Sequence, residues 1–113
     1  MLAKANRVVT GAEFRSVVRT GRRVTSTLAV VYSTRTGDSS PTRFGFIVAK
    51  SVGGSVVRNR MRRRLRAIGR ELLEIRGTGH DIVVRPLPAS AEASWVTLHS
   101  EISEAVTRSV ERR

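Results

Sequence analysis

The densest group of side chains suited to specific chemistry is a run of arginines near the middle of the chain. Nine consecutive residues contain six of them, namely Arg58, Arg60, Arg62, Arg63, Arg64 and Arg66. An ordinary solvated helix face would relieve such a run with Glu one turn away, yet no acidic residue lies between Gly45 and Arg70. Guanidinium groups present planar forks of donors that match phosphate groups and base edges. The run therefore predicts a nucleic-acid contact.

Other residue types that could perform catalysis are few and dispersed. The two histidines, His80 and His99, do not have the spacing of a metal-binding pair. His80 adjoins Asp81, but neighbours on a strand point to opposite faces. Seven of the nine carboxylates follow residue 70, away from the arginines, and they show no converging pattern. The sequence predicts no catalytic residue and no metal ligand, and hence a binding protein.

Composition narrows the class of protein further. The 113 residues carry a formal charge of +12 and are expected to form one domain, residues 1–113. Residues 1–70 contain 16 Lys or Arg against two acids, whereas residues 71–113 contain 5 against seven acids. Cysteine is absent, and no apolar run approaches the ~20 residues of a membrane span. These features predict a soluble cytoplasmic protein that does not bind membranes.

The arginines require a helix to display them. Apolar residues recur every three or four positions in this region, at Val57, Met61, Leu65, Ile68, Leu72 and Ile75. A helix would bury them as one stripe and turn the arginines outward. The small-residue stretch from Ser51 to Ser55 is expected to form the loop before it.

The N-terminal third should supply a second, shorter helix. Residues 1–9 are expected to form a flexible basic arm, and Thr10 with Glu13 has the form of a capping box. The helix would place Phe14, Val17 and Val18 on one side. Gly21 is expected to end it in the left-handed conformation.

The remaining segments predict an α+β fold. Residues 24–32 and 43–49 read as strands that pair as a hairpin-like unit, and residues 81–85 as a further strand. A last helix from about Ser94 would bury Trp95, Leu98, Ile102, Ala105, Val106 and Val110. The order α-β-β(-β)-α-β-α describes a single α/β sandwich with a small mixed sheet, in which the default crossover between parallel strands is right-handed.

One stretch also resembles a known family. The string from Gly45 to Lys50 (GFIVAK), a glycine-containing loop, and then Val57 to Arg63 (VRNRMRR) resemble the signature of the bacterial ribonuclease P protein subunit. The similarity extends from about Arg7 to the region after Pro88. The resemblance implies a left-handed βαβ crossover at this unit, contrary to the default.

The resemblance also implies a function. Members of the family are the protein subunit of a ribonucleoprotein endoribonuclease whose active centre lies in its RNA. The protein would bind that catalytic RNA and precursor tRNA, and would assist removal of the tRNA 5′ leader by promoting substrate and metal-ion binding. Mg²⁺ would be used by the RNA-containing holoenzyme, with no cofactor bound by the protein alone.

Matching residue by residue, the resemblance assigns two sites. The RNA-binding residues would be Lys50, Arg58, Asn59, Arg60, Arg62, Arg63 and Arg66. The leader-binding cleft would contain Phe14 and Tyr32. Val18 and Ala29 stand where the family often has further aromatic residues, and Ser51 where it often has a second basic residue, so this cleft has fewer rings than is usual.

Three other classes compete with this interpretation. Composition alone is equally compatible with a ribosomal or other structural-RNA-binding protein. A DNA-binding protein would insert its basic helix into the major groove, but this helix must bury one face along its length and is followed by no dimerising heptads. A protein-only nuclease would need converging carboxylates.

Overall fold

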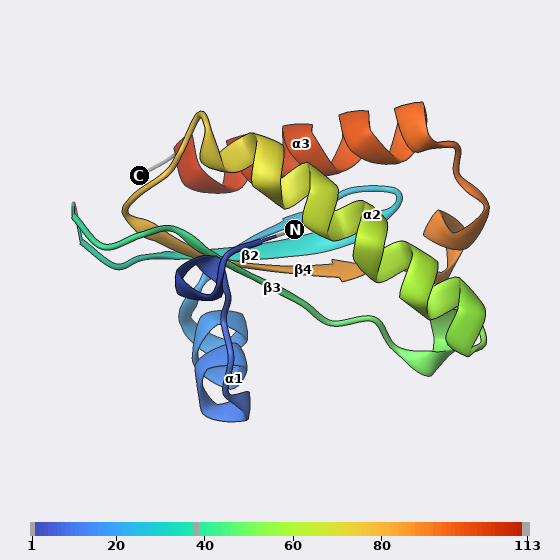
Figure 1. Ribbon diagram of the computed structural model, residues 1–113, viewed down its shortest axis with the longest axis horizontal. Helices are drawn as coiled ribbons and strands as arrows, with labels where there is room; N and C mark the ends of the chain where they lie inside the picture. Colours follow the sequence, from blue (N-terminus) through green and yellow to red (C-terminus); the bar gives the residue numbers. More distant parts are fainter. Residues whose placement is uncertain (1, 38, 112–113) are drawn as a thin grey trace.

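The chain forms a four-stranded sheet covered on both faces by helices (Figure 1). The computed structural model describes residues 2–37 and 39–111. The main elements are α1 (Gly11–Thr20), β1 (Arg22–Thr25), β2 (Ala29–Arg35), β3 (Arg43–Phe46), α2 (Ser55–Leu73), β4 (His80–Pro86) and α3 (Trp95–Glu111). Short 3₁₀ turns occupy Lys4–Asn6, Lys50–Val52 and Pro88–Glu92. Helices α2 and α3 lie on one face and α1 on the other, so the predicted α+β sandwich with a mixed sheet is confirmed.

The strand order is β1-β2-β4-β3, which corrects the predicted pairing. The segment 24–32 is divided into two strands, because Ser26 forms a turn in which its Oγ accepts from the N–H groups of Leu28 and Ala29. The hairpin is β1 with β2, whereas β2 and β3 are separated by β4. Strand β4 takes the central place because its residues 82–84 are almost fully buried and need cover on both faces.

Strands β3 and β4 form a parallel pair, with α2 as the connection between them. In the register of this pair, Phe44 lies beside Ile82 and Phe46 beside Val84. The left-handed crossover remains the implication of the family resemblance. Phe44 and Phe46 point to the α2 side of the sheet, where their rings stack with centroids 6.2 Å apart.

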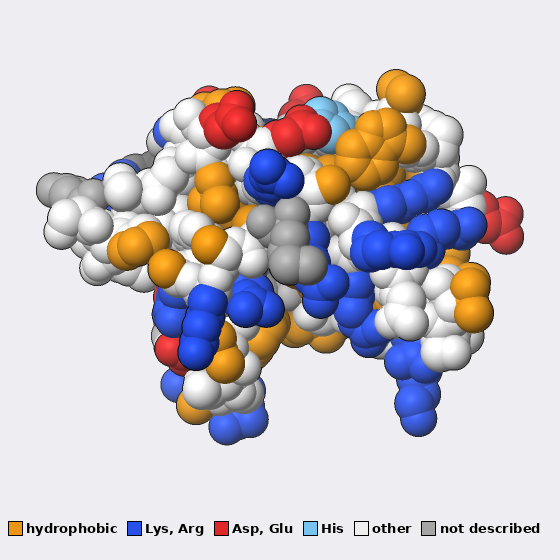
Figure 2. Space-filling view, viewed as in Figure 1, with side chains coloured by type: hydrophobic (Ala, Val, Ile, Leu, Met, Phe, Trp, Pro, Cys, Tyr) orange, Lys and Arg blue, Asp and Glu red, His pale blue; other side chains and the backbone are white. Residues whose placement is uncertain are grey.

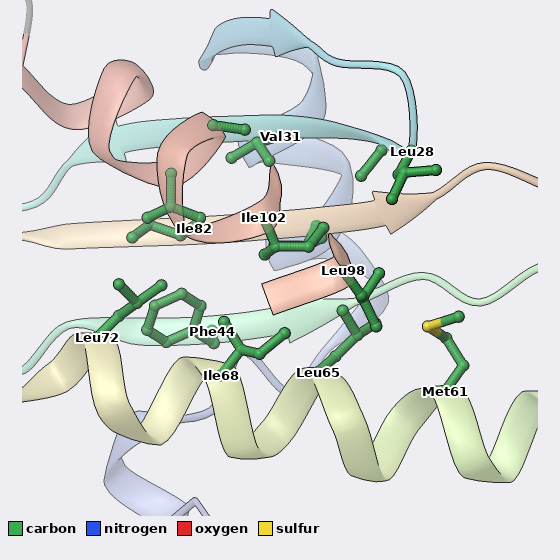
Figure 3. Close-up of a cluster of buried hydrophobic side chains, with 14 of the residues drawn as sticks. Leu28, Val31, Phe44, Met61, Leu65, Ile68, Leu72, Ile82, Leu98 and Ile102 are labelled. Carbon is green, nitrogen blue, oxygen red and sulfur yellow. The ribbon is translucent and has the colours of Figure 1, made fainter. Parts of the chain in front are cut away.

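The main core lies between the sheet and the helices α2 and α3 (Figure 3). From α2 it receives Met61, Leu65, Ile68 and Leu72, as the periodicity predicted. Ile75 is not part of the stripe: α2 ends at Leu73 and the Ile75 side chain is 73% exposed in the following turn. Trp95 at the start of α3 is also outside the core, with 38% of its surface exposed.

Gly21 ends α1 as predicted, but its conformation is extended rather than left-handed. Its φ is −77°, so any residue could adopt the backbone angles. A Cβ atom at this position would instead lie 2.4 Å from the Val17 carbonyl oxygen and 2.9 Å from that of Ser33. Glycine is needed here because β1 begins at the next residue, and the backbone of α1 and β2 leaves no room for a side chain.

Residues 2–9 also differ from the flexible arm that the sequence predicted. Leu2 and Val8 are buried, and the Val8 N–H donates to the Phe44 carbonyl at 2.9 Å. The Asn6 side chain donates to the Thr42 carbonyl at 2.8 Å. The segment thus lies along β3, docked by the two apolar side chains that it buries.

A capping box joins α1 to the sheet. The Thr10 hydroxyl accepts from the Glu13 N–H, and Glu13 Oε1 accepts from the N–H groups of Val9 and Thr10, all at 3.1 Å. Glu13 Oε2 also pairs with Arg43 Nη1 at 3.0 Å, and Arg43 binds both carboxylate oxygens of Asp81 at 2.8 and 2.9 Å. The backbone hydrogen bonds, followed by Arg43, lower the pKa of Glu13 from 4.5 to about 2. One side chain therefore caps α1 and ties it to β3 and β4.

This lowered pKa predicts how acid affects the fold. The ionised carboxylate of Glu13 stabilises the folded state above its unfolded pKa near 4.5, and this contribution is lost as pH falls toward about 2. In thermal unfolding at neutral pH, Glu13→Gln should melt below the parent protein. The difference should shrink as the pH falls through that window. A difference in melting temperature that is independent of pH would contradict the role given to the charge.

Candidate nucleic-acid interface

The helix α2 divides its arginines between two sides. With 100° per residue, positions three or four apart form rows that flank the buried stripe. The row on the β3 side contains Arg58, Arg62 and Arg66. The row on the α3 side contains Arg60, Arg64, Ala67 and Glu71. Asn59 and Arg63 lie between the rows, opposite the core, so α2 displays a positive surface over much of its circumference.

Three of the arginines are held by contacts within the protein. Arg58 Nε donates to the Gly53 carbonyl at 3.1 Å and so closes the loop before the helix. Arg62 Nη1 donates to Asn59 Oδ1 at 2.9 Å. Arg64 Nη1 donates to the Ala93 carbonyl at 3.2 Å, which joins α2 to the segment before α3. These contacts orient the guanidinium groups and leave further donors of each fork available.

The other predicted arginines point to solvent. Arg60 and Arg63 are exposed, and neither they nor Arg66 form a hydrogen bond or ion pair within the described part of the chain. Lys50 is exposed in the 3₁₀ turn that precedes α2. Figure 2 shows lysines and arginines gathered in a band over α2, with acidic side chains at the upper edge. The seven predicted residues therefore share one connected region.

The predicted leader-binding pair lies on the other face of the sheet and is only partly accessible. Phe14 on α1 is half-buried and lines an apolar groove whose other walls are Arg15, Val18, Arg19 and Ile47. Tyr32 is buried: only 6% of it is exposed, within a cluster formed with Val17, Val30 and Val83. Tyr32 therefore offers no open ring, because α1 covers it, and its assignment to the leader-binding cleft stays a prediction. Tyr32 lies beneath the residues that line the groove, since Phe14, Val18 and Ile47 pack against its cluster.

A hollow at the edge of β3 connects the two predicted sites. It is lined on one side by Phe14 and on another by Arg62 and Arg66 from α2. The N-terminal segment adds Lys4 and Arg7 to the same wall. The sequence analysis did not identify Lys4, Arg7 or Ile47 as site residues. The apolar residues Leu2 and Val8, which flank the basic ones, were the available signal that this segment docks.

The histidines are not arranged for catalysis. Asp81 binds Arg43 rather than His80, and burial lowers the pKa of His80. His99 Nε2 lies 2.7 Å from Glu71 Oε1, so it links α3 to α2. Among residues 2–37 and 39–111, no three His, Asp or Glu side chains converge as a metal site would require. In the same residues, no helix has the length and apolar character needed to cross a membrane.

The fold and this site define an RNA-binding protein: an α+β sandwich that displays an arginine-covered helix joined by a basic hollow to an apolar groove. A family model described as Ribonuclease P matches residues 2–110. The chain belongs to the ribonuclease P protein family. It is thus the RNA-binding subunit of a ribonucleoprotein endoribonuclease that processes tRNA, and ribonuclease P RNA is its partner.

The individual relatives agree. The ribonuclease P protein component of Clavibacter michiganensis is 49% identical over 110 residues, which is 97% of each chain. That of Pseudarthrobacter chlorophenolicus is 46% identical over 112 residues, covering 99% of this chain and 82% of the relative. The ribonuclease P protein of Thermotoga maritima has the same fold, with a TM-score of 0.80, 23% identity, and coverage of 90% of this chain and 96% of that one. The alternative of a ribosomal protein is set aside.

Proposed function

We propose that this subunit binds the 5′ leader of precursor tRNA beside Phe14 while α2 holds the catalytic RNA. The observation that carries the proposal is the hollow at the edge of β3, because residues of both sites line it. A strand of RNA bound there would pass from Arg62 and Arg66 to the ring of Phe14 without crossing the sheet.

The chemistry of this path suits a single strand. Unpaired RNA is held by basic grooves that follow its phosphates and by aromatic or apolar surfaces that receive its bases. Lys4, Arg7, Arg62 and Arg66 supply charge along the hollow. Beyond Phe14, the groove continues between Arg15 and Arg19 over an apolar floor. The leader is the part of precursor tRNA that mature tRNA lacks, so this path would distinguish the two.

The same proposal places Mg²⁺ in the RNA of the holoenzyme. Several carboxylates of the protein are already engaged: Glu13 and Asp81 with Arg43, and Glu71 with His99. They do not form the convergent oxygen set that Mg²⁺ prefers. The protein would favour metal occupancy by binding the substrate against the catalytic RNA. We place this activity in the cytoplasm, which the absence of cysteine suits.

Replacing Phe14 tests the leader path. In holoenzyme reconstituted with a bacterial ribonuclease P RNA, Phe14→Leu and Phe14→Ala should both bind precursor tRNA less tightly, whereas affinity for mature tRNA should be unchanged. Loss of one stacked base is worth ~1–3 kcal/mol. The measurement is the ratio of the two dissociation constants.

Phe14→Leu serves as the matched variant because it keeps an apolar side chain against Gly45, whose Cα region contacts the ring. Thermal unfolding should therefore change little in that variant, and its affinity for the catalytic RNA should equal that of the parent. A stable Phe14→Leu protein with the parent's preference for precursor tRNA would refute the leader path. It would leave the binding of catalytic RNA by α2 standing.

A further inference from the structure

A second aromatic surface lies at the start of α3, on the opposite side of the sheet from Phe14. Trp95 is the single tryptophan of the chain, 38% of it is exposed, and it belongs to neither apolar core. The next residue, Val96, is 74% exposed. Figure 2 shows apolar side chains and a histidine gathered over the start of α3, directly beside the band of arginines. An exposed aromatic patch that borders a charged surface is typical of a contact site.

Two contacts hold this patch against α2. Two residues before Trp95, the Ala93 carbonyl accepts from Arg64 Nη1 at 3.2 Å. One helical turn after it, His99 binds Glu71 at 2.7 Å, and the rings of Trp95 and His99 lie 5.5 Å apart at an angle of 52°. Trp95 is therefore bracketed by attachments to two residues of one α2 row. The backbone on both sides of Trp95 is thereby held against α2, which lowers the entropy lost when a ligand binds there.

The part of α2 that contacts the segment before Trp95 carries positive charge. Arg60 precedes Arg64 by one turn in the same row of α2, and it is exposed without an ion pair in the described residues. The first turn of α3 contains no acidic residue. Glu71 is the acid at the far end of the row, where His99 engages it. An aromatic face near guanidinium groups that keep unused donors suits a ligand that has both a flat ring and a phosphate.

We propose that Trp95 stacks on an unpaired base of an RNA strand whose phosphates contact Arg60 and Arg64. The base must be unpaired because bases within an A-form duplex keep their faces inside the stack. The inference rests on the proposed RNA-binding role of α2 and extends that interface onto α3. It assigns Trp95 to a different RNA segment from the one bound at Phe14, because the two aromatic residues lie on opposite faces of the sheet.

The single tryptophan allows a direct test on the intact protein. A short single-stranded oligoadenylate should quench Trp95 fluorescence and protect it from iodide. Inorganic polyphosphate should bind the same arginines without quenching, because it has no base to stack. An oligoadenylate that binds without changing the fluorescence would overturn the proposal.

Variants supply the second measurement. Trp95→Leu keeps an apolar side chain but has no ring, and it should weaken oligoadenylate binding by about 5-fold to 150-fold, the equivalent of ~1–3 kcal/mol for one stacked base. Trp95→Phe should retain most of the affinity. Val96→Ala truncates an apolar neighbour that is more exposed than Trp95, and it should bind as the parent does. The salt dependence should be the same in all of them, because no phosphate contact is removed.

The outcomes separate this inference from the function on which it rests. Parent-like affinity in Trp95→Leu, with RNA binding still abolished by loss of the α2 arginines, would refute stacking and leave the RNA interface in place. Failure of the parent to bind any RNA would refute both. A fluorescence spectrum that shifts with protein concentration in the absence of RNA would show that a second copy of the chain covers Trp95, and would also overturn the proposal.

Discussion

Replacing Arg60 and Arg63 together by alanine is expected to weaken binding to ribonuclease P RNA by about 100-fold or more. A hydrogen bond to a charged group contributes about 1.5–3 kcal/mol, and two such contacts are lost. Both side chains are exposed and have no partner among the described residues, so the fold should keep its thermal transition. The logarithmic dependence of affinity on salt should also become shallower by roughly 0.7–0.9 for each phosphate contact removed.

The matched control is Arg22→Ala with Arg23→Ala. These two exposed arginines lie on β1, at the opposite edge of the sheet from β3. Replacing them lowers the net charge by two, as replacing Arg60 and Arg63 does. If both double variants lost affinity equally, the RNA would respond to overall charge and not to the surface of α2. A binding constant for the parent that did not depend on salt would contradict phosphate contacts altogether.

The second large effect is expected from Arg43→Met, which should lower the free energy of unfolding by about 2–3 kcal/mol. Removing one partner of a buried ion pair leaves the other charge unpaired, at a cost of about 3–5 kcal/mol when burial is complete. Here the Asp81 side chain is 11% exposed and that of Arg43 is 29% exposed, so we expect a cost below that range. Chemical denaturation would measure the change.

The partner carboxylate provides the control. Asp81→Asn removes the buried charge, so adding it to Arg43→Met should recover part of the lost stability, as a double-mutant cycle would show. Arg43 also binds Glu13, the residue that caps α1. Arg43→Met should therefore loosen α1 and reduce the preference for precursor tRNA even under conditions in which the protein remains folded. Simple additivity of the two substitutions would contradict direct pairing.

Local patterns predicted the helices and the arginine surface well. The spacing of Met61, Leu65 and Ile68 depends only on the period of a helix, and it determined which side chains face the core. The capping box at Thr10 is likewise a contact between residues three apart. The arginines were identified correctly as outward-facing because the buried stripe leaves them no other direction.

Features that depend on distant neighbours were not predictable in the same way. Nothing within residues 24–49 indicates that β4 separates β2 from β3, since that choice is made by the more deeply buried strand. Tyr32 is buried because α1 packs over it, and Leu2 is buried because β3 offers it a place. Trp95 fitted the apolar spacing of α3 but falls where the helix extends beyond the core. Burial of a single aromatic residue is decided by the tertiary structure.

The central position of β4 determines the order in which the new chain can fold. Strand β2 ends at Arg35 and β4 ends at Pro86, so at a synthesis rate of ~5–20 residues per second the sheet must wait on the order of 3–10 s for its middle strand. The whole of α2 leaves the ribosome before β4, and α3 follows later still. Until then the apolar stripe of α2 has neither the complete sheet nor α3 to cover it.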